Sequence, residues 1–366
     1  MTRMSRPRRS PAFFERKWYL GIAALVALTA GVIGIISGTI PLFRSSPVFE
    51  NAEIIVDSSQ AMATELFDGV PKLQAAAQAV QNVMTNEGLQ RNNLALREVG
   101  GACGSVPPKP TLDFSTSNER KIRSRMSALT ASGSANLVDT LLQAITDFED
   151  IARFKDVSKR IIVITGNPDA CGRDVEAAKQ RIERLKKAGH DISVDFHFIG
   201  LGLNADGVNA LNNLAETTGG STDFPQTRDD LQKVMHRIVE VEPVFRSADA
   251  VTKILNANIH AINDVTSAAD NVQAKERQRI ARAAFETSEV PFRDLGKRQT
   301  TPAFKSIYEA AARQHDRQKQ MLDESEAIVA DPKNNERIKS FNENAVAFNA
   351  EAAKLNEQLR TVATAH

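Results

Sequence analysis

The spacing of apolar residues changes along the chain, and each change predicts a different kind of element. Between residues 50 and 242, short apolar runs alternate with segments in which apolar residues recur every three or four positions. The short runs are typical of buried strands, and the longer spacing is typical of amphipathic helices. Strands alternating with crossover helices predict an α/β fold, a doubly wound and mostly parallel sheet. We expect strands at 53–56, 94–99, 160–165, 191–200 and an edge strand near 224, and helices at 63–87, 118–129, 136–154, 174–188, 206–217 and 231–241.

Residues 243–366 have a different pattern. Glycine nearly disappears, and apolar residues repeat at alternating steps of three and four over long stretches. This predicts three long helices in an antiparallel coiled-coil bundle, with breaks near 291–302 and 331–332. The bundle either packs on itself or forms an intermolecular coiled coil. Breaks of this length favour antiparallel neighbours within one chain.

The amino-terminal segment is the most apolar part of the chain. Residues 18–43 carry no charge and span roughly 26 residues, against the ~20 that cross a bilayer as a helix. Basic residues crowd positions 1–17, whereas Arg44 is the one charge in the linker at 44–49 before Glu50. The positive-inside rule then predicts a single-pass inner-membrane protein with a cytoplasmic tail and the bulk of the chain periplasmic or extracellular. A cleaved signal peptide is the alternative, but the run is long and Ile36-Ser37-Gly38 is a poor cleavage site.

Composition and motifs narrow the functional classes. A formal charge of +1 and 5% aromatic residues give no reason to expect nucleic acid as a partner. Gly200-Leu201-Gly202-Leu203-Asn204-Ala205 fits a loose dinucleotide pattern, but no complete βαβ unit follows it, so no nucleotide is expected. The histidines lack metal-ligand spacing, so His197 and the others are expected to be surface or packing residues. No catalytic motif is present, and we expect no enzyme.

Four stretches, in the expected order, resemble the von Willebrand factor A family over residues 50–242. The first is Asp57-Ser58-Ser59 at the end of a strand, and the second is Gly133-Ser134-Ala135-Asn136-Leu137 before a helix. The third is the apolar strand ending in Thr165-Gly166-Asn167, and the fourth joins the strand at Phe198 to Gly219-Gly220. The resemblance implies a doubly wound sheet with a protein-binding face at the carboxyl ends of its strands.

The resemblance also implies a divalent cation, and here the sequence departs from the family. The family holds the ion with an Asp and two Ser from the first loop, a Thr from the second and an Asp from the third, which are hard oxygen ligands. Asp57 and Ser59 match, whereas Ala61, Ala135 and Gly166 replace the other ligands. A shifted alignment would bring in Ser134 or Asp169.

One carboxylate and one hydroxyl hold a cation poorly. We therefore expect no cofactor, with Mg²⁺ or another divalent cation as the less favoured alternative. In that case Asp57 is expected to cap a helix or to hydrogen-bond neighbouring backbone amides.

The two cysteines lie in loops that the resemblance places at one edge of the sheet. Several bacterial members of the family resemble this chain in having paired Cys in these loops, which implies a disulfide between Cys103 and Cys171. An extracytoplasmic location permits such a bond. A redox-active pair is the alternative, but the chain has no Cys-x-x-Cys motif.

Together these patterns predict a membrane-anchored, extracytoplasmic protein–protein interaction module that serves scaffolding, adhesion or assembly in the cell envelope. Its partner-binding face is expected to carry Asp57, Ser59, Ser134, Asn136, Thr165 and Asn167. The alternative is an envelope sensor or signalling element, in which the helical bundle relays partner binding through the anchor.

Overall fold

A computed structural model describes residues 50–85, 92–103, 110–150, 158–168, 171, 180, 183–184, 194–266, 268, 271–287, 289–299, 301–331 and 333–364. These residues form two compact units, one ending at Val244 and one beginning at Phe245. The anchor predicted at 18–43 lies outside the described residues. Within the described ranges, no helix is both long and apolar enough to cross a membrane.

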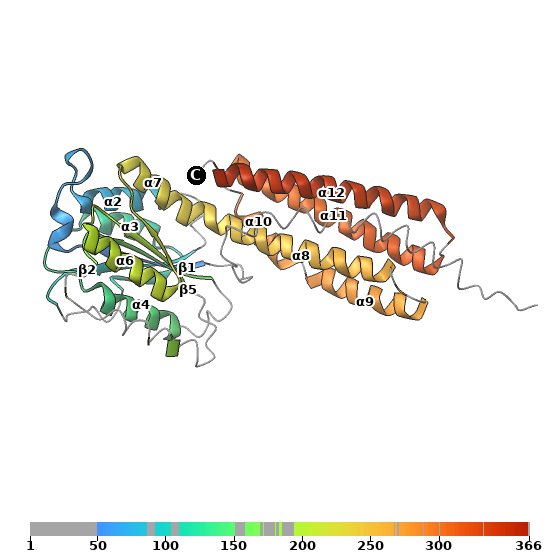
Figure 1. The fold of residues 1–366 in the computed structure, drawn as a ribbon, viewed down its shortest axis with the longest axis horizontal. Helices are drawn as coiled ribbons and strands as arrows, with labels where there is room; N and C mark the ends of the chain where they lie inside the picture. The colour runs from blue at the N-terminus through green and yellow to red at the C-terminus, as the bar shows by residue number, and fades with distance from the viewer. Residues whose placement is uncertain are drawn as a thin grey trace, which may run out of the picture. The chain divides into compact units, whose positions relative to one another are not determined.

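The first unit is built on a six-stranded sheet in the order β3-β2-β1-β4-β5-β6 (Figure 1). All neighbouring strands pair in parallel except β3, which is antiparallel to β2 at one edge. The predicted mostly parallel sheet is therefore confirmed, but the short strand β3 was not predicted. The strands are β1 (Glu50–Asp57), β2 (Asn93–Val99), β3 (Leu112–Ser115), β4 (Ser158–Thr165), β5 (Val194–Gly200) and β6 (Ser221–Asp223).

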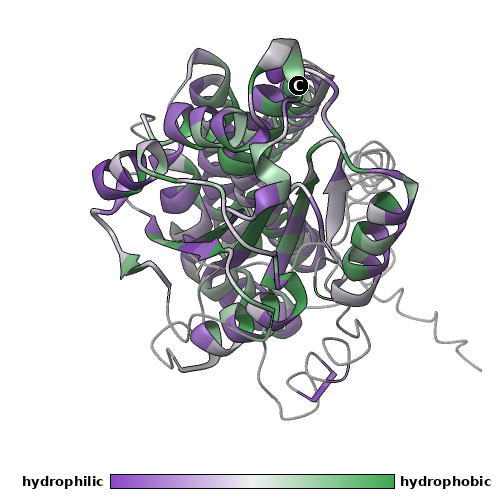
Figure 2. Ribbon diagram, turned by 90° about the vertical axis from the view of Figure 1, so that its left-hand side faces the viewer, coloured by the Kyte–Doolittle hydropathy of each residue, from purple (hydrophilic) through white to green (hydrophobic). Residues whose placement is uncertain are grey.

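Both faces of the sheet are buried, which is why its strands read as continuous apolar runs. In β1, Ile54 and Val56 face one core while Ile55 faces the other. The hydropathy colouring in Figure 2 changes from green to purple around the helices, as expected for helices with one buried side. The first core includes residues of α2 (Lys72–Val83), α3 (Glu119–Ser127) and α7 (Arg228–His236), and the second includes residues of α4 (Leu137–Asp150) and α6 (Ala205–Thr218).

The helix expected at 63–87 begins only at Lys72. Pro71 precedes its first residue, and the chain before it forms two short 3₁₀ turns, η3 (Gln60–Ala63) and η4 (Phe67–Gly69). Proline has no N–H and a fixed φ, so it starts a helix well but interrupts one that would run through it. Leu66 and Val70, which fitted the helical spacing, instead pack against the core from this loop.

One further helix differs from expectation at both ends. The helix predicted at 231–241 starts earlier, as α7, where the Thr227 side chain accepts a hydrogen bond from the amide of Asp230. It then continues through a π-helical turn, η7 (Arg237–Val241), directly into α8 (Glu242–Thr266). Most of the helix expected at 174–188 lies outside the described residues.

The second unit is helical, as predicted. The helix α8 enters it and is followed by α9 (Asn271–Thr287), α10 (Glu289–Lys297), α11 (Pro302–Ala330) and α12 (Asn335–Thr364). α11 and α12 run side by side (Figure 1). The first of the three predicted long helices is divided in the structure into α8 and α9. Pro291 does not interrupt a helix, because it lies in the first turn of α10, where a proline is tolerated.

Candidate functional site

Asp57 is the last residue of β1 and lies at the carboxyl edge, which is the end of the sheet where β1, β2, β4 and β5 finish. Its side chain is buried, and both carboxylate oxygens accept hydrogen bonds. Oδ1 accepts from the amide of Ser59 at 2.8 Å, and Oδ2 accepts from Thr165 Oγ1 at 2.9 Å and the amide of Gly166 at 3.0 Å. The carboxylate thus joins the loop after β1 to the loop after β4, in agreement with the expected bonds to backbone amides.

At two positions where the family has metal ligands, 135 and 166, the residues of this chain pack against neighbouring side chains. Ala135 is buried in the second core. A Cβ atom on Gly166 would lie 2.8 Å from Met62 Sδ and 3.3 Å from Lys72 Cδ, so an aspartate there would displace both side chains. Ser59 Oγ is buried with no hydrogen-bond partner in the described part of the chain, and it is the one feature that would suit an ion.

Lys72, at the start of α2, brings a positive charge to the same place. The residue is only 7% exposed, and its Nζ donates a hydrogen bond to the carbonyl oxygen of Gly202 at 3.1 Å. Burial lowers the pKa of Lys72, and the opposite charge of Asp57 partly counteracts that lowering. The ammonium group of Lys72 therefore lies close enough to Asp57 to interact with it electrostatically. The helical spacing of the sequence had placed Lys72 in the middle of a longer helix and gave no sign of this interaction.

These contacts do not fit a family-type metal ion. The single carboxylate already accepts three hydrogen bonds, a second one at position 166 would require Met62 to shift, and the Lys72 side chain occupies the adjoining space. A divalent cation bound here would lose hydrogen bonds of Asp57 and would be repelled by the ammonium group.

The six residues predicted for the partner-binding face do gather around the carboxyl edge, but most of them are buried. Asp57, Ser59, Asn136 and Thr165 are buried, Ser134 is half-buried and Asn167 is exposed. The side-chain amide of Asn136 donates to Asp139 Oδ2. The backbone N–H of Ser134 donates to Gly101 O, and that of Asn167 donates to Thr165 Oγ1. These residues hold the loops in shape, and direct contact with a partner stays a prediction.

Cys103 and Cys171 form a disulfide, which confirms the predicted pair. Cys103 follows β2 and Cys171 follows β4, so the bond links two loops at the carboxyl edge. The loop after β2 also meets the one before α4, where Gly101 and Gly133 pair as an isolated bridge. A Cβ on Gly133 would lie 2.5 Å from the Gly101 backbone, and its φ of +69° also favours glycine.

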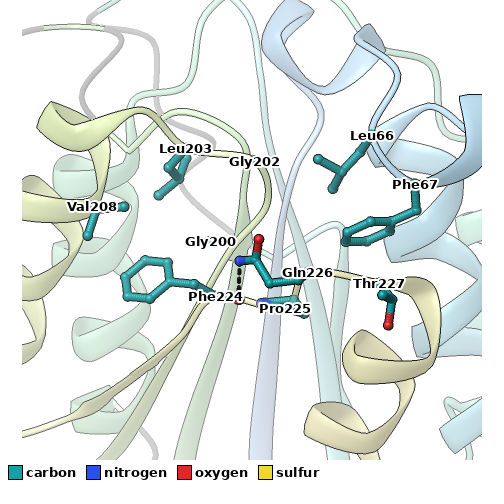
Figure 3. Close-up of a pocket in the computed structure, with 10 residues that line it drawn as sticks. All are labelled: Leu66, Phe67, Gly200, Gly202, Leu203, Val208, Phe224, Pro225, Gln226 and Thr227. Atoms are coloured by element: carbon teal, nitrogen blue, oxygen red, sulfur yellow. Dashed lines mark hydrogen bonds between the residues drawn. The ribbon is translucent and has the colours of Figure 1, made fainter.

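A pocket of about 370 Å³ opens beside Lys72 at the same edge (Figure 3). Leu66 and Phe67 face Leu203, Val208 and Phe224 across it. Two glycines at the end of β5 leave the space open. A Cβ on Gly200 would lie 2.7 Å from Leu203 Cδ1, and one on Gly202 would lie 2.5 Å from Leu66 Cδ1. The segment Gly200–Ala205, which fitted a nucleotide pattern, thus contributes to a pocket lined by both apolar and polar groups.

Comparisons with known proteins found similar solved structures. No family model matches the chain, and no curated protein does. The VWA domain of SpRpn10 matches at 17% identity over 51% of this chain and 94% of that one, with a TM-score of 0.40. The PilB minor pilin from Streptococcus sanguinis matches at 13% identity over 55% of this chain and 62% of the pilin, with a TM-score of 0.39. Manganese-loaded TRAP from Plasmodium vivax matches at 13% identity over 53% of this chain and 74% of that one, with a TM-score of 0.37.

The chain therefore spans less than two thirds of the minor pilin. The strand order is that of a doubly wound sheet, and the described residues of the first unit have a von Willebrand A-like fold.

Proposed function

We propose that this chain is a single-pass membrane protein whose von Willebrand A-like domain binds another protein outside the cytoplasm, in the cell envelope. Binding at the carboxyl edge needs no metal ion in this proposal, and the chain acts by binding rather than by catalysis. The apolar segment at 18–43 and the basic tail before it support the anchor and its orientation.

One observation carries the proposal. The carboxylate of Asp57 accepts hydrogen bonds from donors in the loops after β1 and β4. The ammonium group of Lys72 lies near enough to interact with it electrostatically. The loops of the carboxyl edge are therefore held in place by the chain itself. A partner can meet a preformed surface without first requiring an ion, which lowers the entropic cost of binding.

The pocket beside Lys72 supplies a place for an apolar side chain of the partner. Pockets that bury an aromatic or aliphatic anchor side chain contribute much of the free energy of binding at protein interfaces. Leu66, Phe67, Leu203 and Phe224 provide the apolar lining, and the exposed Gln226 lies at the rim with its amide bonded to Phe224 O at 2.8 Å. These contacts favour a protein with a protruding apolar residue as the partner.

Site-specific photo-cross-linking in isolated membranes tests the proposal. A photoreactive amino acid is placed at Gln226, beside the pocket, and in a matched control at Asn213, which is exposed on α6. The membranes are treated with EDTA alone, or with EDTA followed by excess Mg²⁺. We expect a discrete protein adduct from position 226, of equal yield in both treatments, and none from position 213.

Two outcomes would contradict the proposal. An adduct that forms only after Mg²⁺ is restored would show that the edge works through a metal ion. Equal labelling from positions 226 and 213, with no discrete partner, would show that the pocket is not an interaction site.

A further inference from the structure

A second polar cluster lies in the same unit, at the amino-terminal end of β5 rather than at the carboxyl edge. Asp195 and His197 are two positions apart on β5 and so share a face of the sheet. Glu242 is the first residue of α8, directly after the π-helical turn. His197 Nε2 lies 3.4 Å from Asp195 Oδ2 and 3.3 Å from Glu242 Oε2, and the three atoms lie within 4.8 Å of one another.

The burial of the His197 imidazole and the contacts of its two nitrogens suit a metal ligand. It is only 5% exposed, and its Nδ1 lies 3.0 Å from Ser221 Oγ. Nε2 and Glu242 Oε2 are both buried and have no hydrogen-bond partner among the described residues. A neutral imidazole in this position offers the lone pair of Nε2 to a metal ion.

Two arginines lie among the carboxylates that surround the ring. Arg160 lies between two carboxylates, with Nη2 at 3.0 Å from Glu50 Oε1 and 3.7 Å from Asp195 Oδ2. Arg237 bonds both Asp223, at 2.7 Å, and Glu242 Oε1, at 2.5 Å. Both carboxylates of the cluster thus face guanidinium groups, Asp195 that of Arg160 and Glu242 that of Arg237.

We propose that Asp195, His197 and Glu242 bind a divalent transition-metal ion, with Zn²⁺ as the best match. Bonds of about 2.0–2.1 Å in a tetrahedral site place neighbouring ligand atoms about 3.4 Å apart. The two distances from His197 Nε2, 3.4 Å and 3.3 Å, have this value before any ion is bound. A nitrogen and two carboxylate oxygens suit Zn²⁺, whereas Mg²⁺ favours oxygen ligands alone.

The surroundings complete such a site. If Nδ1 donates its hydrogen to Ser221 Oγ, then Nε2 is the atom left to bind the metal, and Arg237 orients the carboxylate of Glu242 through its other oxygen. The three ligand atoms are buried, whereas the side chains of Asp195 and Glu242 are 22% and 20% exposed, so an ion would enter past the exposed parts of these two carboxylates. A bound ion would tie β5 to the first turn of α8, and the domain would become more resistant to unfolding.

The test is a Zn²⁺ titration of the untagged full-length chain, purified in detergent, stripped with EDTA and dialysed. His197→Gln and Glu242→Gln each remove one ligand. His236→Gln is the matched control, because His236 and Glu240 form a second His–Glu pair, at 3.1 Å, outside the cluster. We expect the unmodified chain to bind one Zn²⁺ with a micromolar or tighter Kd. Each ligand variant should weaken this affinity by at least about tenfold, and the control by less than about twofold.

Two further readouts keep the result interpretable. Thermal unfolding in EDTA shows whether each variant still folds, and Zn²⁺ should raise the Tm of the unmodified chain but not that of the ligand variants. Co²⁺, as a spectroscopic substitute, should give the intense visible absorption of a tetrahedral site and lose it when Zn²⁺ is added. Equal Zn²⁺ affinity in the unmodified chain and in folded Glu242→Gln, or no saturable binding at all, would overturn the proposal.

Discussion

Arg97 on β2 is completely buried in the sheet and is shared by two carboxylates. Its Nε donates to Glu53 Oε1 on β1 at 2.7 Å, and its Nη2 bonds Asp147 on α4. The Asp147 side chain is 14% exposed, whereas Glu53 is fully buried and its Oε2 has no hydrogen-bond partner among the described residues. Burial, opposed by the charge of Arg97, raises the pKa of Glu53 from 4.5 to about 7.

This shift makes the stability of the sheet depend on pH. Between pH 4.5 and about 7, folded Glu53 keeps a proton that the unfolded chain has released, so the free energy of unfolding falls as the pH rises through this range. Glu53→Gln removes the titrating group. Urea unfolding at pH 5 and pH 8 should show a decrease in the native chain that is larger than in this variant by roughly 1 to 3 kcal/mol.

Glu98→Gln, on the neighbouring strand, is the control for this prediction. Glu98 pairs with Arg125, whose side chain is 43% exposed, and the variant retains Glu53. It should therefore keep the native pH dependence. An unchanged slope in Glu53→Gln would contradict the assignment of the proton to Glu53.

Single residues also show what the sequence alone could and could not predict at the site. Asp57 is followed by Ser-Ser and preceded by an apolar run, so its place at a strand end and its bonds to nearby amides were predictable from local pattern. Lys72 and His197 were not, because their roles depend on neighbours that the fold brings from distant positions, such as Gly202 and Glu242. No local spacing reports such contacts.

At the scale of elements, the packing of α8 against α11 contains polar side chains where a coiled-coil seam would have apolar ones. Gln318 is completely buried, its amide nitrogen donates to Leu255 O at 2.5 Å, and its oxygen lies 3.4 Å from Asn258 Nδ2. Buried polar groups of this kind fix register when they are paired and destabilise when one partner is lost.

A double-mutant cycle on this pair measures its contribution. Gln318→Leu leaves Asn258 and the carbonyl of Leu255 without their partner and should lower the free energy of unfolding by about 1–3 kcal/mol. Adding Asn258→Leu removes the stranded amide and should restore part of that loss, so the two effects are not additive. Gln320→Leu, on the exposed side of α11, is the control and should change little. Additive losses would show that the two side chains do not interact.

The sequence predicted the bounds of an element correctly where one local pattern was strong. The buried run at Ile161–Ile164 gave β4 because apolar β-branched residues on both faces suit only a central strand. The start of α2 was wrong because helical spacing continued across Pro71 and concealed the break. β3 was missed because it has only four residues, none of them buried, and its pairing with β2 is its main distinguishing feature.

At the scale of the whole molecule, the chain combines an α/β unit, a helical unit and an apolar amino-terminal segment that we propose as an anchor. The proposal treats the α/β unit as the part that binds a partner. Its central claim is that the carboxyl edge is complete without a metal ion, because Lys72 and the hydrogen bonds of Asp57 take the place of one.

The most direct test is a Mg²⁺ titration of the full-length chain by calorimetry, in a His197→Gln background that disables the proposed Zn²⁺ site. We predict no saturable Mg²⁺ binding, and the same thermal unfolding curve with Mg²⁺ as with EDTA. Micromolar Mg²⁺ affinity that disappears on Asp57→Ala would contradict the account, since it would show that the carboxyl edge still holds the ion.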